Sequence, residues 1–101
     1  MSDKTFSIIP LNGRNYPTWK LQCKMSLMKE GLWSIVDGTE AAPAVTHDNF
    51  TRFVSRRNKA LAIIVLSVEP DLLYILGDPE SPITAWDKLE KQFQKKTWAN
   101  K

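Results

Sequence analysis

His47 and Cys23 have the side chains best suited to acid–base or nucleophilic chemistry, and the chain has one histidine and one cysteine. A catalytic histidine needs a nucleophile within reach, but the sequence has no Gly-x-Ser-x-Gly turn that would present a serine. We therefore expect His47 to lie on the surface or to cap a helix. Cys23 lies within an apolar helical stripe, with no cationic cluster or helix N-terminus beside it. We expect a buried and unreactive thiol there.

The remaining residue types that carry chemistry are scattered. Asp78 and Glu80 flank Pro79, which favours a solvated turn over a paired acid–base site. One cysteine and one histidine do not make a Cys/His metal site, and the four glycines form no phosphate-binding loop. The sequence therefore predicts a protein that is not an enzyme and that holds no metal and no cofactor.

Basic residues are the other candidates for binding. The formal net charge is +3, and the excess of positive charge falls in the second half of the chain. If this charge binds nucleic acid, the affinity will fall steeply with salt. Charge of this strength is also typical of an ordinary solvated surface. The candidate nucleic-acid contacts are Arg52, Arg56, Lys59, Lys91, Lys95 and Lys96.

These residues must be positioned by helices, because the apolar residues recur with a spacing of three to four. The patterns predict helices over residues 16–30, 32–36, 47–68, 71–76 and 82–95, joined by short loops. Residues 1–10 are expected to form an extended arm that either lies over an apolar groove or exchanges with a neighbouring molecule. The prediction is an all-α fold, a compact bundle of about five helices in one domain over residues 1–101, with 11–101 as its helical core.

Local signals predict where these helices begin and end. Pro17 fits the first turn of the first helix, which Asn15 is expected to cap, and Gly31 is a natural stop. Thr46 is expected to cap the third helix, and Ser81 the last. The second half of the helix over 47–68 is apolar almost all round, so it is predicted to be the central buried helix. Its first half is expected to expose Arg52, Arg56 and Lys59 on one solvent face.

The helix over residues 16–30 has two apolar stripes rather than one. A single stripe is typical of a surface helix, whereas two stripes indicate contacts on two sides. Both stripes belong to the core, or part of one is an interface; the sequence leaves both interpretations open. The first stripe is Tyr16, Trp19, Cys23 and Leu27, and the second is Leu21, Met25, Met28 and Leu32.

Several ordered motifs cover nearly the whole chain. The pattern F/L-x-G-x-N-Y-x-x-W-K is matched by Leu11, Gly13, Asn15, Tyr16, Trp19 and Lys20. The pattern L-W-x-x-V-x-G is matched by Leu32, Trp33, Val36 and Gly38. Residues 57–64 then form a charged run followed by an apolar run. Residues 84–89 with Phe93 resemble a closing helix of the pattern T-A-x-x-x-W/L-L-x-x-x-F. In this order and spacing the motifs resemble the start of Gag polyproteins from copia-type LTR retrotransposons.

The resemblance implies a fold like that of the N-terminal domain of a retroviral capsid. It implies a structural domain that self-associates through weak repeated contacts to build a virus-like particle in the cytoplasm. RNA would be bound mainly through regions absent from this chain, such as the family's zinc knuckle, and no membrane partner is implied. The resemblance assigns no catalytic residues. Its motifs imply a core of Tyr16, Trp19, Leu32, Trp33, Trp86, Leu89 and Phe93.

Three interpretations of function follow. The leading one is the self-associating capsid domain. The alternatives are a basic nucleic-acid-binding module, or a domesticated Gag fragment that acts as a host adaptor or an inhibitor of particle assembly. Genomic context would separate the last from the first. The candidate self-association residues are Phe6, Ile8, Ile9, Met25, Met28 and Trp98.

Overall fold

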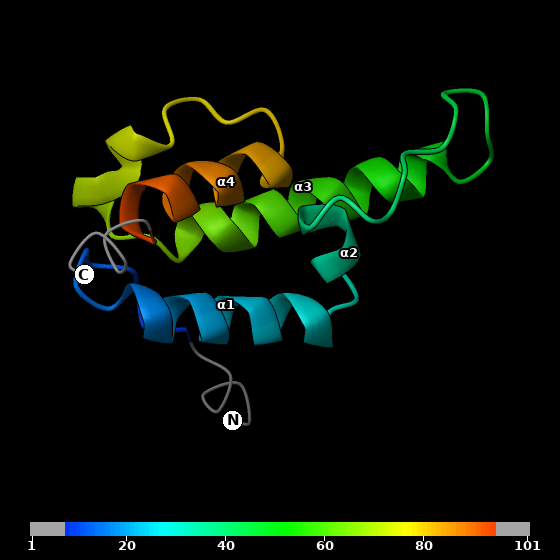
Figure 1. The fold of residues 1–101 in the computed structure, drawn as a ribbon. Coiled ribbons are helices and arrows are strands. Elements are labelled where there is room, and N and C mark those ends of the chain that lie inside the picture. The colour runs from blue at the N-terminus through cyan, green and yellow to red at the C-terminus, as the bar shows by residue number, and fades with distance from the viewer. Residues whose placement is uncertain (1–7, 95–101) are drawn as a thin grey trace.

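The computed structural model describes residues 8–94, and their regular secondary structure is helical (Figure 1). Within this range no strand forms, and sheet-like pairing is limited to one parallel bridge between Leu11 and Val68. The predicted all-α bundle is therefore confirmed. The elements are α1 (Tyr16–Lys29), α2 (Trp33–Val36), α3 (Phe50–Leu66), the 3₁₀ helix η2 (Pro70–Ile75) and α4 (Pro82–Phe93).

Local sequence explains both ends of α1. Pro17 lies in its first turn, where the missing N–H is not needed. Gly31 ends it with a φ of 72°, a left-handed conformation that suits glycine, and Leu32 N–H donates to Leu27 O at 2.8 Å. The predicted cap by Asn15 is wrong, because its side chain closes the preceding turn instead. Its Oδ1 accepts from Asn12 N and its Nδ2 donates to Pro10 O, both at 2.9 Å.

The long helix α3 begins later than predicted. Residues 45–49 form turns in which the N–H groups of Asn49 and Phe50 donate to His47 Nδ1 and His47 O. Helix α3 therefore starts at Phe50, and Thr46 does not cap it. Local hydrogen bonds of this kind compete with the helix for the same backbone groups.

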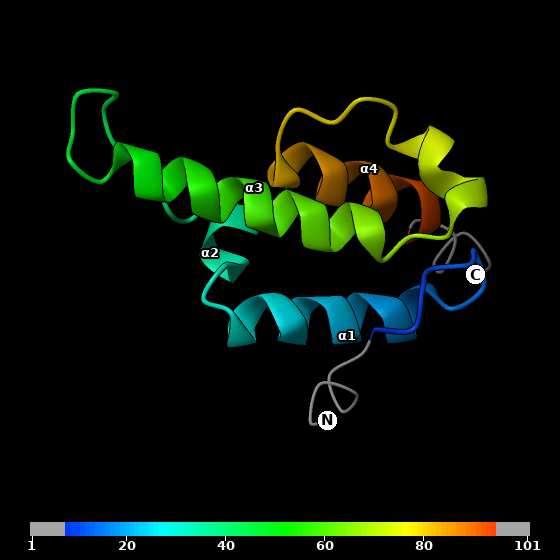
Figure 2. The ribbon, with the colours of Figure 1, turned by 180° about the vertical axis from the view of Figure 1, so that it is seen from behind.

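The prediction that α3 is the central buried helix is also wrong. Helix α3 contacts α1, α2 and α4, but its N-terminal half extends beyond the other helices (Figures 1 and 2). Only Ala60 and Ile64 of α3 are fully buried, and the side chain of Leu66 is 82% exposed. The apolar run is therefore covered on one side only.

An aromatic cluster forms the centre of the core, where α1, α2 and α4 meet. The rings of Trp19 and Trp86 stack with centroids 5.3 Å apart, and Trp33 meets Trp86 edge-on at 5.1 Å. Tyr16 stacks on Phe93 at 5.8 Å. Such ring pairs add to the gain from burial. Of the implied motif core, Tyr16, Trp19, Leu32, Trp86 and Leu89 are buried, while Trp33 and Phe93 are partly buried against them.

The 3₁₀ helix η2 follows the end of α3, and α4 packs alongside α3 (Figure 1). The predicted helix over 71–76 is a 3₁₀ helix, η2, none of whose residues is fully buried. Helix α4 begins where predicted, because Ser81 Oγ accepts from Thr84 N–H at 3.2 Å and Pro82 follows. In residues 8–94 no helix is both long and apolar enough to cross a membrane.

Candidate self-association surface

Helix α1 has one buried face and one exposed apolar face, which settles where its two stripes lie. Its buried residues are those of the first stripe, Tyr16, Trp19, Cys23 and Leu27. On the opposite side the exposed fractions are 60% for Leu21, 45% for Met25 and 50% for Met28. Positions four and three residues apart share a helix face, so these three side chains form one continuous strip. We call this strip the α1 ridge.

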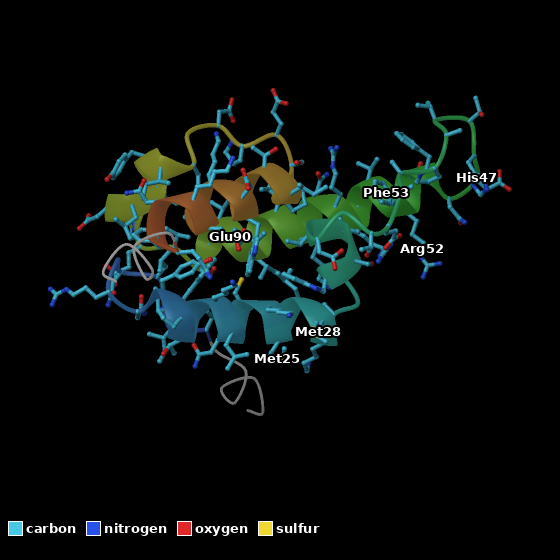
Figure 3. The ribbon with its side chains drawn as sticks, viewed as in Figure 1. Met25, Met28, His47, Arg52, Phe53 and Glu90 are labelled. Atoms are coloured by element: carbon cyan, nitrogen blue, oxygen red, sulfur yellow. The ribbon has the colours of Figure 1, made fainter. Side chains whose placement is uncertain are left out.

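The α1 ridge points away from the rest of the protein. Figure 3 shows Met25 and Met28 on the side of α1 that faces away from α3 and α4. Leu32 belongs to the same sequence pattern but is buried. The reason is that α1 ends at Lys29, and the turn at Gly31 redirects the chain toward the core.

Lysines flank the α1 ridge. Helix α1 contains Lys20, Lys24 and Lys29 and no acidic residue. Lys20 Nζ donates to Gln94 Oε1 at 2.9 Å and lies 3.7 Å from Glu90 Oε2. The ammonium of Lys24 lies 5.1 Å from the centre of the Trp33 ring, in a cation–π contact. Lys29 Nζ lies 4.0 Å from Glu30 Oε2, so each of the three lysines has a partner nearby.

The arm lies along the protein itself over the residues that are described. Ile9 N–H donates to Gln22 Oε1 at 2.9 Å, which holds the arm against α1. Ile8 packs against the core and is only partly exposed, whereas Ile9 is exposed. The first of the two expected arrangements, an arm over an apolar groove, fits residues 8–10. Two other candidate contacts, Phe6 and Trp98, lie outside the described residues.

The predicted nucleic-acid contacts do not form one open basic face. Arg56 was expected in solvent but is partly buried, because Nη1 donates to Glu40 Oε2 and Nη2 to Gly31 O, both at 2.6 Å. The Arg56 guanidinium lowers the pKa of Glu40. Lys59 pairs with Glu30 at 3.0 Å, and Lys91, which lies on α4, pairs with Asp87 at 3.1 Å. Two of the four basic residues of α3, Arg56 and Lys59, are thus paired with carboxylates.

Arg52 lies beside a surface pocket at the projecting end of α3. The pocket has a volume of about 380 Å³ and is also lined by His47, Phe53 and Arg56. Figure 3 shows Arg52, Phe53 and His47 at this end of the molecule, away from Met25 and Met28. The remaining candidates, Lys95 and Lys96, lie outside the described residues. Arg52 therefore lies apart from the α1 ridge, whereas Lys59 pairs with Glu30 at the end of α1.

The two residues best suited to chemistry are not brought together. Cys23 is buried on α1, and burial raises the pKa of its thiol to about 12, although a contact with Ser67 opposes this. His47 is exposed in the turn before α3. Among residues 8–94 no group of three or more His, Cys, Asp or Glu side chains is placed to hold a metal ion.

Among residues 8–94, sequence reasoning missed five large exposed apolar residues as candidate contacts, namely Leu21, Val45, Leu66, Tyr74 and Ile83. Leu21 belongs to the second stripe and has the same spacing as Met25, so the helical period was a sufficient signal. The helical period gave no such signal for Leu66 or for Tyr74, whose side chain is 75% exposed. Their exposure depends on how α3 and η2 pack, which a local pattern does not specify.

Comparison with known proteins identifies the family. No curated protein and no solved structure matched the chain. The family described as gag-polypeptide of LTR copia-type matches residues 23–101, which is most of the chain. The match includes the last turns of α1 and every later element. The chain therefore belongs to the Gag polypeptides of copia-type LTR retrotransposons, a family of structural, non-enzymatic polyprotein components.

Proposed function

We propose that this chain is a structural module that self-associates to build the cytoplasmic virus-like particle of a copia-type element. The observation that carries the proposal is the α1 ridge, an apolar strip that nothing in residues 8–94 covers. Family membership supplies the context, because Gag is a structural polyprotein component.

The size of the ridge suits a weak contact. Fully burying a leucine or methionine side chain contributes about 1.5–3 kcal/mol. The side chains of Leu21, Met25 and Met28 are only about half exposed in the single molecule. Each can therefore add on the order of 1 kcal/mol to an association. A contact of this strength is unstable alone but becomes effective when many copies bind at once.

Sedimentation velocity and electron microscopy test the proposal. We expect the chain to associate weakly and reversibly at millimolar concentration, and Met25→Asp/Met28→Asp to remain monomeric. The matched control is Val45→Asp, which places a charge at an exposed apolar residue in the loop before α3. A chain that stays monomeric at millimolar concentration, with no particles from the longer Gag protein, would contradict the proposal.

Two alternative functions remain predictions. Nucleic-acid binding is less favoured, because Arg56, Lys59 and Lys91 already pair with carboxylates. Titration with RNA at low salt would test it. A domesticated fragment that acts as host adaptor or inhibitor of assembly would use the same α1 ridge, and the genomic context distinguishes it from a mobile element.

A further inference from the structure

A shallow groove between α1 and the end of α3 stays open within residues 8–94. It has a volume of about 340 Å³ and is lined by Ile8, Ser26, Ile63, Leu66 and Ser67. Ser26 lies on α1, and Ile63 and Leu66 lie near the end of α3. The side chain of Leu66 is 82% exposed. One wall of the groove is therefore apolar surface that the described residues leave uncovered.

The arm leads directly into this groove, because Ile8 is one of its lining residues. Ile8 packs against the core, whereas the next residue, Ile9, is 53% exposed. Side chains of an extended segment alternate between two faces, so residues two apart share a face. If this alternation continues, Phe6 shares the groove side with Ile8, and the small polar Ser7 faces outward. The sequence before Ile8 thus supplies an aromatic side chain where the groove lacks a cover.

The residues that follow the arm are fixed to their own molecule. Ile9 N–H donates to Gln22 Oε1 of α1 at 2.9 Å. Leu11 N–H donates to Ser67 O at 2.9 Å, and Glu69 N–H donates to Leu11 O at 3.0 Å. Figure 2 shows the start of the described chain, in dark blue, running alongside α1. The arm therefore begins from a point that is held against both α1 and the end of α3.

The length of the tether decides which molecule Phe6 can reach. An extended chain spans at most about 3.6 Å per residue, so the Cα of Phe6 lies within about 7 Å of the Cα of Ile8. Because Ile8 lines the groove of its own molecule, this tether keeps Phe6 near that groove at an effective concentration on the order of millimolar. The arm of a second copy would have to compete with it. Exchange of Phe6 between molecules is therefore disfavoured.

We propose that residues 1–7 of the same chain occupy this groove and that Phe6 anchors them there. The Phe6 ring packs against Ile63 and Leu66, so it belongs to the packing within one molecule and not to the self-association surface. The inference is independent of the proposed function, since it concerns contacts inside a single chain. The α1 ridge then remains the apolar surface that is offered to a second copy.

Nuclear Overhauser effects test the contact on the full chain, below the concentration at which it associates. We expect cross-peaks between the ring protons of Phe6 and the methyl groups of Ile63 and Leu66. A mixture of isotope-labelled and unlabelled chains, recorded with isotope filtering, separates contacts within a molecule from contacts between molecules. Cross-peaks that arise only between molecules would show an exchanged arm and overturn the proposal. The absence of any cross-peak from Phe6 to the groove would overturn it as well.

Reactivity of a thiol in the groove gives a second, independent measurement. Ser26→Cys in a Cys23→Ala background places a single thiol on the α1 wall of the groove. Adding Phe6→Ala should make this thiol react roughly tenfold faster with a thiol reagent, because burial of a phenylalanine side chain favours the docked arm by about that factor. Adding Ser7→Ala instead is the matched control and should leave the rate unchanged.

A reporter away from the groove controls for a general loosening of the fold. Tyr74→Cys in the same Cys23→Ala background places the thiol at an exposed position that does not line the groove. Its rate should not respond to Phe6→Ala, and circular dichroism checks that every variant is folded. Equal rates for Ser26→Cys with and without Phe6 would contradict the proposal. Equal acceleration at both reporters would also contradict it, because Phe6 would then act on the whole fold and not on the groove.

Discussion

Trp19 Nε1–H donates to Ser67 Oγ at 3.0 Å, and this buried hydrogen bond joins the first helix to the residue that ends α3. Ser67 Oγ also donates to Ile64 O at 2.8 Å. The backbone beside it pairs too, because Leu11 N–H donates to Ser67 O and Glu69 N–H donates to Leu11 O. Side chain and backbone thus fix the start of the helical core to the end of α3.

Ser67→Ala should destabilise the fold. The substitution leaves the buried indole N–H of Trp19 without an acceptor, and an unsatisfied buried group costs about 1–3 kcal/mol. Urea denaturation measures the free energy of unfolding. Ser55→Ala, at an exposed position on the same helix, should change stability by at most about 0.5 kcal/mol. Equal effects at the two positions would mean that the hydrogen bond adds nothing.

The two faces of α1 should respond differently to truncation. Leu27→Ala removes a fully buried side chain and should lower the free energy of unfolding by about 2–5 kcal/mol. Met25→Ala shortens a half-exposed side chain and should change stability by at most about 0.5 kcal/mol. Thermal and urea unfolding of both variants measure this difference. A large loss of stability in Met25→Ala would show that the second stripe is part of the core.

Arg56→Ala should lower the free energy of unfolding by about 1 kcal/mol. The loss is small because the ion pair with Glu40 is only partly buried and the carbonyl of Gly31 is still able to bind water. Lys59→Ala removes a more exposed ion pair and is the matched control, with almost no effect expected. Denaturant unfolding of both variants at neutral pH measures these costs.

The same ion pair should make stability depend on pH. Hydrogen bonds from Arg56 lower the pKa of Glu40 below its usual 4.5, so the folded state favours the carboxylate. The resulting stabilisation is present above pH 4.5 and is lost as the pH falls through the lowered pKa. Unfolding measured from pH 7 to pH 2 should show a smaller loss in Arg56→Ala than in the parent chain. Identical profiles would contradict this role.

Cys23 should be unreactive in the folded protein. Burial raises the pKa of its thiol from the usual 9.0 to about 12, so almost no thiolate is present at pH 8. Labelling with a thiol reagent should be slow until denaturant is added, whereas Met25→Cys in a Cys23→Ala background should react rapidly. The unfolded chain loses the proton near pH 9 and the folded one does not, so stability should fall as the pH rises above 9.

Ser81→Ala should weaken the start of α4 by about 1 kcal/mol, because the Thr84 N–H loses its acceptor. Ser81→Gly is the matched comparison and should cost only a few tenths of a kcal/mol relative to the parent chain, since glycine is tolerated at this position. Thermal unfolding of the three proteins ranks them. An alanine variant as stable as the glycine variant would contradict the capping role.

Several local signals in the sequence gave accurate predictions, although the caps expected from Asn15 and Thr46 do not form. The start and end of α1 follow from Pro17 and Gly31, and the start of α4 follows from Ser81. Each of these residues acts on backbone groups within a few positions, so no knowledge of distant segments is needed. The period of three to four likewise placed Tyr16, Trp19, Cys23 and Leu27 on one face.

Where the outcome depends on distant partners, the predictions were wrong. Arg56 looked like a solvent-exposed cation, but Glu40 and the carbonyl of Gly31 hold it, and these lie 16 and 25 residues away. Leu66 looked buried, yet its side chain is 82% exposed among the described residues 8–94. Nothing in the neighbouring residues specifies either arrangement.

The sequence by itself determined that α1 has two apolar stripes, because the spacing of side chains around a helix depends only on their order. It did not determine which stripe is buried. Tertiary packing decided this, since Trp19 stacks on Trp86 and donates to Ser67, and both partners are far away in the chain. Those contacts turn the first stripe inward and leave Leu21, Met25 and Met28 exposed, where a second copy can reach them.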